Sequence, residues 1–193
     1  SGAMGEGWSD WFAASLYDDP IIGEYVSGNS SKGIRRYALD RNPLTYGDLC
    51  QGPNGCEVHD DGEIWSGILW DLREKFIEKY DYEEGKAQVE QLVIDGMKFT
   101  LINPSMLDGR DAILAADVAD GGESQDLIWK AFACKGMGVS ASTLDHNDSS
   151  PQEAFDLPDG TDCRGRVELP WIDELREIFG SIFRDIIKII RPV

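Results

Sequence analysis

Residues 5–12 read Gly5-Glu6-Gly7-Trp8-Ser9-Asp10-Trp11-Phe12, and they combine two carboxylates with bulky aromatic side chains. Glu6 and Asp10 are four residues apart, so a helix places them one turn apart on the same face. Like charges at this spacing repel, which favours a metal ion or a positive side chain between them. The alternative interpretation is a helix N-terminus whose acidic residues are favoured by the helix dipole. We expect a helix from Glu6 to Tyr17, because Asp18-Asp19-Pro20 follows and the residue before a proline avoids the helical region.

Elsewhere, apolar residues recur at three- and four-residue spacing, which predicts further helices. The expected ranges are 62–80, 86–99, 107–118 and 124–134. Residues 21–62 are rich in Gly, Asn, Ser, Pro and Asp and lack sustained periodicity, so we expect a long loop there. The predicted fold class is therefore mainly α, a helical bundle-like lobe with a long irregular loop region.

Six further segments follow residues 5–12 in an order that matches one known family. They are Lys32-Gly33-Ile34-Arg35-Arg36-Tyr37, Asn42-Pro43-Leu44-Thr45-Tyr46, Glu57-Val58-His59-Asp60-Asp61-Gly62-Glu63-Ile64-Trp65, Gln91-Leu92-Val93-Ile94-Asp95-Gly96-Met97-Lys98, Asp108-Gly109-Arg110-Asp111-Ala112-Ile113-Leu114-Ala115-Ala116-Asp117 and Ile128-Trp129-Lys130-Ala131-Phe132-Ala133. Together these segments resemble the fungalysin family of secreted zinc metalloendopeptidases, which share a two-lobed thermolysin-like fold. The resemblance covers roughly residues 1 to 158, and it implies that the chain is part of the carboxy-terminal lobe of such an enzyme.

The resemblance also implies roles for individual residues. Glu6 matches the third protein ligand of the catalytic zinc, and Asp10 matches a carboxylate that orients a zinc-bound histidine. His59 matches the histidine that donates to the oxyanion of the tetrahedral intermediate. Arg35 matches the arginine that holds the substrate carbonyl, with Arg36 as its rival for that role.

In this family, the first two zinc ligands and the general base come from a His-Glu-x-x-His helix. The present chain contains two histidines, His59 and His146, so it cannot contain that motif. We therefore expect the chain to start just after the zinc helix, to carry one zinc ligand of three, and to be inactive alone. Its expected partners are a missing amino-terminal lobe that carries the zinc helix and a protein or peptide substrate. The implied chemistry is hydrolysis of peptide bonds by a zinc-activated water.

The surroundings of His59 leave two questions open. In related thermolysin-like enzymes an upstream aspartate braces this imidazole, whereas here Asn54, Glu57, Asp60 or Asp61 are the available groups. We expect His59 to lie just before a helix that begins near residue 62. The positive end of that helix dipole disfavours the imidazolium form, while the nearby carboxylates favour it, so the protonation state is not decided by sequence.

The chain has 36 acidic and 18 basic residues and a net charge of −18, which disfavours nucleic acid and anionic lipid as partners. No uncharged apolar run approaches the roughly 20 residues that a membrane span needs. The four cysteines allow three pairings. We favour Cys50 with Cys56 and Cys134 with Cys163, as expected in an oxidising extracellular setting, over four buried thiols.

Residues 1–158 are predicted to form the peptidase lobe, and residues 159–193 a linker and an amphipathic extension. Pro170 begins the expected tail helix, whose charged face is mixed, so packing or self-association is favoured over a membrane-surface role. Its apolar stripe consists of Ile172, Leu175, Ile178, Phe179, Ile182, Phe183, Ile186 and Ile190.

Two other functions remain as alternatives. The first is a non-catalytic protein- or peptide-binding domain derived from the peptidase fold, which a missing His-Glu-x-x-His motif upstream would favour. The second is an acidic calcium-binding module, in which Asp108, Arg110 and Asp111 would contribute. For these three residues, however, helix capping and ion pairing are the favoured roles.

Overall fold

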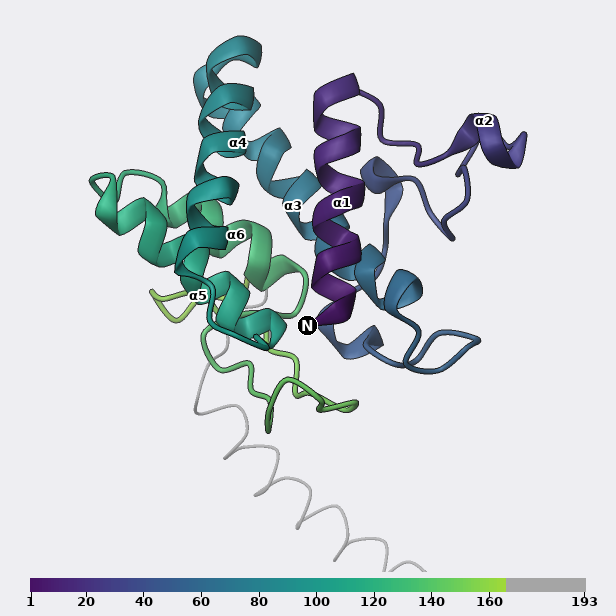
Figure 1. The fold of residues 1–193 in the computed structure, drawn as a ribbon. Coiled ribbons are helices and arrows are strands. Elements are labelled where there is room, and N and C mark those ends of the chain that lie inside the picture. The colour runs from purple at the N-terminus through teal and green to yellow at the C-terminus, as the bar shows by residue number, and fades with distance from the viewer. Residues whose placement is uncertain (166–193) are drawn as a thin grey trace, which may run out of the picture.

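A computed structural model describes residues 1–165 of the chain (Figure 1). Its elements are α1 (Gly2–Tyr17), α2 (Glu24–Ser27), the short 3-10 helices η1 (Leu39–Arg41) and η2 (Tyr46–Asp48), α3 (Val58–Tyr80), α4 (Tyr82–Phe99), α5 (Met106–Ala119) and α6 (Gln125–Cys134). The expectation of a mainly helical lobe is confirmed. The helix predicted from Pro170 lies outside the described residues, and the division of the chain at residue 158 stays a prediction.

Three helices begin about one turn earlier than their apolar stripes indicated. α3 begins at Val58 because the Glu57 side chain caps it, accepting the backbone N–H groups of His59 at 3.0 Å and Asp60 at 2.9 Å. In the same way, the Asp81 side chain accepts the N–H of Glu84 at the start of α4. The prediction that His59 precedes the helix is therefore wrong, since His59 lies in the first turn of α3.

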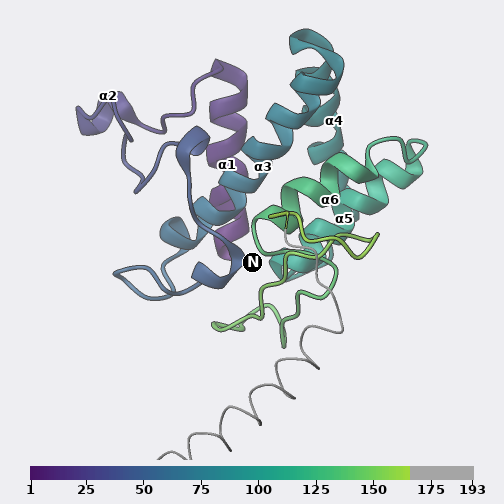
Figure 2. The same cartoon turned by 180° about the vertical axis from the view of Figure 1, so that it is seen from behind.

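α3 is the central helix and contacts α1, α4 and α6 (Figures 1 and 2). The fully buried Trp65 of α3 packs against both α1 and α6. Its ring lies 5.6 Å from that of Trp8 on α1 and 5.6 Å from that of Phe132 on α6. The predicted stripe of α3 is buried at Ile64, Ile68, Leu69, Leu72 and Phe76. Within residues 1–165, none of the helices combines the length and the apolar character needed to cross a membrane.

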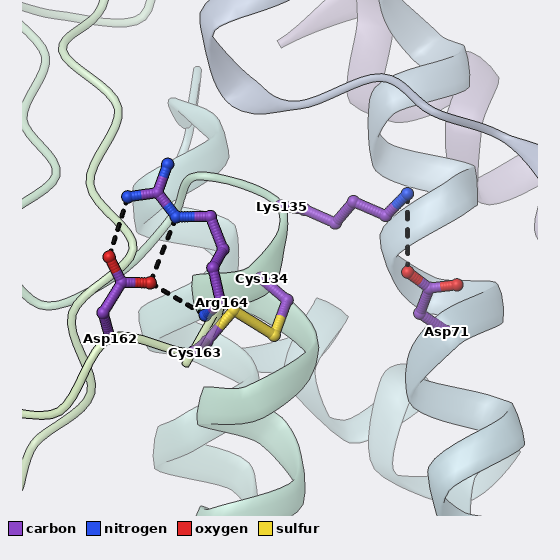
Figure 3. Close-up of a disulfide and its surroundings, with 6 residues drawn as sticks. All are labelled: Asp71, Cys134, Lys135, Asp162, Cys163 and Arg164. Carbon is purple, nitrogen blue, oxygen red and sulfur yellow. Dashed lines mark hydrogen bonds and ion pairs between the residues drawn. A yellow bond between two sulfur atoms is a disulfide. The ribbon is translucent and has the colours of Figure 1, made fainter. Parts of the chain in front are cut away.

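The end of α6 is joined to two distant parts of the chain by adjacent residues, as Figure 3 shows. Cys134 forms a disulfide with Cys163, and Lys135 lies 3.5 Å from the Asp71 carboxylate of α3. Burial raises the pKa of Asp71, and the Lys135 ammonium opposes that rise. The second predicted disulfide, Cys50–Cys56, is also present, so the expected pairing is confirmed.

α5 shows the capping and ion pairing predicted for its first turn. Asp108 and Ser105 form a capping box, in which each side chain accepts the backbone N–H of the other residue. Arg110 pairs with Asp111 at 2.7 Å and donates to the backbone carbonyls of Met137 and Gly138. These contacts give each of the three charged residues a partner among the described residues.

Candidate functional site

The site begins where α1 crosses α3 at very close range. A Cβ atom on Gly7 would lie 2.6 Å from the carbonyl oxygen of Gly62, and one on Gly62 would lie 2.9 Å from the carbonyl oxygen of Ala3. Neither position has room for a side chain, so glycine allows the two backbones to approach. The crossing places Glu6 of α1 beside His59 of α3.

Glu6 and His59 face each other across this crossing, with 3.3 Å between the carboxylate Oε2 and the imidazole Nε2. The side chain of Glu6 is 38% exposed and that of His59 is 49% exposed. Both groups therefore reach solvent, and a ligand can approach them without a rearrangement of the core.

Glu57 contacts the other ring nitrogen of His59. Glu57 Oε1 lies 2.7 Å from His59 Nδ1, while Glu57 Oε2 accepts the capping hydrogen bonds at the start of α3. The other groups considered for this role are engaged elsewhere: Asn54 donates to the Asp60 carboxylate, and Asp61 accepts the backbone N–H of Cys50. Glu57 is therefore the residue that braces the imidazole in this structure.

This arrangement favours the imidazolium form of His59. The hydrogen bond that His59 donates to Glu57 is the main cause that raises the pKa of His59, and the negative charges of Glu57 and Glu6 add to it. Burial and the Arg35 guanidinium act in the opposite direction. The same hydrogen bond lowers the pKa of Glu57 from 4.5 to about 2. The carboxylate neighbours of the imidazole thus favour its protonated form.

Asp10 is bound by a positive side chain, as its position near Glu6 predicted. Arg35 donates from Nε to Asp10 Oδ2 at 2.6 Å and from Nη2 to Asp10 Oδ1 at 2.8 Å. The two side chains are only 11% and 6% exposed, respectively. The hydrogen bond to Asp10 is the main cause that raises the pKa of Arg35. Such a two-point contact fixes the plane of the guanidinium.

Arg36, the other candidate for the role of Arg35, contacts α3, whereas Arg35 contacts α1. Its backbone N–H donates to Glu63 Oε1 at 2.5 Å, and its Nε donates to Glu63 Oε2 at 3.0 Å. Its Nη2 also donates to the carbonyl oxygen of Asp60. Burial raises the pKa of Glu63, and the contacts with Arg36 oppose the rise. No role was assigned to Glu63 from sequence, although a charge one position before the apolar stripe of α3 could have drawn attention to it.

Arg35 and His59 line one open recess of about 490 Å³. The recess is also lined by Lys32, Arg36 and Glu57. Glu6 and Asp10 adjoin it through their contacts with His59 and Arg35. The structure therefore brings the four predicted site residues together, whereas His146 lies apart in an exposed loop. A recess with cationic donors beside a carboxylate can hold a polar carbonyl or an anionic intermediate.

The donor groups present fit one part of a zinc site only. Among residues 1–165, no three side chains of His, Cys, Asp or Glu are grouped closely enough to hold a metal ion. Glu6 offers an accessible carboxylate, which is a normal zinc ligand, but a catalytic zinc site needs three protein ligands. The described residues can thus contribute to a zinc site but do not complete one.

Comparison with known proteins identifies the family to which this helical chain belongs. The profile of one family, described as "Fungalysin metallopeptidase (M36)", matches residues 1–141. Because this match covers most of the chain, the protein belongs to the fungalysin family.

Several curated relatives agree with this assignment. An "Extracellular metalloproteinase mep" of Aspergillus terreus is 36% identical over 185 residues, which cover 83% of this chain and 28% of the relative. An "Extracellular metalloproteinase MEP" of Fusarium vanettenii is 35% identical over 187 residues, with the same coverage of 83% and 28%. An "Extracellular metalloproteinase" of Pyrenophora tritici-repentis is 35% identical over 205 residues, covering 88% of this chain and 30% of the relative. The chain thus spans less than a third of the length of these relatives.

Proposed function

We propose that this chain is the carboxy-terminal helical lobe of a secreted zinc metalloendopeptidase and forms one wall of a cleft completed by a second lobe. The observation that supports this proposal is the convergence of Glu6, His59 and the Arg35–Asp10 pair at the crossing of α1 and α3. All four residues lie in the part of the chain that the family profile matches. The partner lobe would carry the remaining zinc ligands and the general base.

Each side chain has a chemical role that its contacts suit. Glu6 would supply one carboxylate oxygen to zinc, which when bound activates a water and polarises the scissile carbonyl. His59 in its imidazolium form carries a proton on Nε2 and can donate it to an oxyanion. Asp10 uses the Nε and Nη2 groups of Arg35, which leaves Nη1 for a substrate carbonyl. Asp10 would also support a zinc-bound histidine of the other lobe.

Secretion is part of the same proposal. Two disulfides are typical of proteins that fold in an oxidising compartment. The relatives named above are described as extracellular. We therefore infer an extracellular enzyme that acts on protein or peptide substrates.

The first test is the zinc content of the purified 193-residue chain, measured by elemental analysis together with a protein-hydrolysis assay. We expect no tightly bound zinc and no turnover. Near one zinc per chain together with hydrolysis would contradict the proposed division of ligands between two lobes.

The second test uses the complete polypeptide. Glu6→Ala should lose zinc, whereas His59→Ala should keep zinc and lose most turnover. Zinc retained in the first variant, or full activity in the second, would contradict the corresponding role.

A complete polypeptide without a His-Glu-x-x-His motif and without turnover would support the non-catalytic binding domain instead. A melting temperature that calcium leaves unchanged would dismiss a calcium requirement.

A further inference from the structure

The loop around α2 protrudes from the helical body on the side of α1 (Figures 1 and 2). Directly after α2, this loop contains Asn29-Ser30-Ser31. An asparagine followed by any residue except proline and then by serine or threonine is the acceptor tripeptide for N-linked glycosylation in secreted proteins. Such an asparagine must also be accessible to be modified.

Within residues 1–165, the side-chain amide of Asn29 is held through its oxygen. Its Oδ1 accepts the backbone N–H groups of Ser31 at 2.9 Å and Lys32 at 3.3 Å. Its Nδ2 has no hydrogen-bond partner among residues 1–165. The hydroxyl-bearing Ser31 is exposed, and Asn29 itself is partly exposed. The side chain is thus held by its oxygen while its nitrogen is left available.

The neighbouring helix α2 is open to solvent. Tyr25 is 97% exposed and Val26 is 83% exposed, and α2 contains no buried residue. The loop that carries Asn29 therefore has solvent on the side of α2, where a bulky, hydrated substituent has room.

Two other Asn-x-Ser tripeptides differ from this one. Asn103-Pro104-Ser105 has proline in the middle, and its serine is buried and occupied in capping α5. Asn147-Asp148-Ser149 is a valid tripeptide with an exposed asparagine, in a loop where the Asp148 carboxylate accepts the backbone N–H groups of Leu144 and Ser150. Asn29 differs from both in that its own side-chain oxygen is held by the loop, with an exposed serine two residues later.

We propose that Asn29 carries an N-linked glycan. The co-substrate is an oligosaccharide attached to a lipid pyrophosphate: the Asn29 amide nitrogen bonds to the first sugar carbon, the bond from that carbon to the pyrophosphate breaks, and the amide proton and lipid pyrophosphate leave. This inference rests on the proposed secretion. Lys32 and Gly33 line the recess that contains His59, so the glycan is attached a few residues from the recess wall.

The test uses the full chain, directed into the secretory pathway of a yeast by a fused signal peptide. A peptide N-glycosidase converts each glycosylated asparagine to aspartate, and heavy-oxygen water labels that aspartate for mass spectrometry. We expect the label at position 29 in most molecules, and none at Asn103. A sample incubated without the glycosidase controls for spontaneous deamidation.

Variants at Ser31 make the test specific. Ser31→Ala keeps the backbone N–H that Asn29 accepts, so the loop conformation is preserved, but it should abolish the label at Asn29. Ser31→Thr should retain it. An unlabelled Asn29 in chains recovered from the secretory pathway, or a label that persists in Ser31→Ala, would overturn the proposal. The readout needs neither zinc nor hydrolysis, so its failure is distinguishable from failure of the proposed peptidase function.

Discussion

Glu57 contacts His59 at two points: its Oε1 lies 2.7 Å from the imidazole Nδ1, and its Oε2 accepts the His59 backbone N–H at 3.0 Å. The first contact favours the protonated ring, and the second caps the helix on which the ring is carried. One carboxylate thus both positions the candidate oxyanion donor and favours its protonated form.

Glu57→Gln should lower the pKa of His59 toward its ordinary value of 6.5, because the main cause of its rise is removed. NMR titration of the His59 imidazole protons measures this change. Asp60→Asn is the matched control, since it removes a neighbouring charge that does not contact the ring. An unchanged titration midpoint for His59 in Glu57→Gln would show that the contact does not exist in solution.

The Glu57–His59 pair should give the unfolding free energy a pH dependence at both ends. The pKa of His59 is raised above 6.5, so its contribution is complete below 6.5 and is lost as the pH rises through the folded-state pKa. The pKa of Glu57 is lowered from 4.5 to about 2, so its contribution is present above 4.5 and is lost as the pH falls toward 2. The unfolding free energies of wild type and His59→Gln, measured by urea denaturation, should differ least at high pH. A difference that grows as the pH rises above 6.5 would reverse the sign argued here.

Asp10→Asn should destabilise the fold by about 3 kcal/mol, because it leaves the largely buried Arg35 guanidinium without its carboxylate. Urea denaturation measures the loss. The double variant Asp10→Asn with Arg35→Gln should cost clearly less than the sum of the two single changes, since neither charge is then left alone. Additive losses would mean that the pair is not coupled.

Gly7→Ala should destabilise the fold by about 1–3 kcal/mol, because its Cβ would meet the Gly62 carbonyl oxygen and the Trp65 side chain. Gly5→Ala is the control on the same helix. It has no neighbouring atom within 4 Å, so it should instead add about 0.5–1 kcal/mol of stability. Thermal unfolding of the two variants gives the comparison, and equal effects would contradict the close crossing.

Much of the fold was predictable because the helices bury stripes of regular spacing. The stripe from Ile64 to Phe76 gave α3 correctly, but its first turn, from Val58 to Asp61, is mostly polar and carries no such signal. The start of α3 depends instead on a capping contact from Glu57, and glutamate is not among the residues most typical of that position.

The candidate site residues could be named from the sequence, but their geometry could not. The resemblance to a family named Glu6, Asp10, Arg35 and His59, and the structure brings them together. The sequence could not show which residue forms a hydrogen bond with the His59 imidazole, because four polar candidates lie within a few residues of it. Nor could it show that Gly7 and Gly62 meet, since that contact joins residues far apart in the chain.

Arg35 and Arg36 are adjacent in the chain, yet one holds Asp10 on α1 and the other holds Glu63 on α3. The peptide bond between these two residues therefore connects the contacts made to the two crossing helices. Any rotation of α1 relative to α3 would pull on this bond and displace both guanidinium groups in the recess. A displacement of either helix would therefore be transmitted to the two guanidinium groups that line the recess.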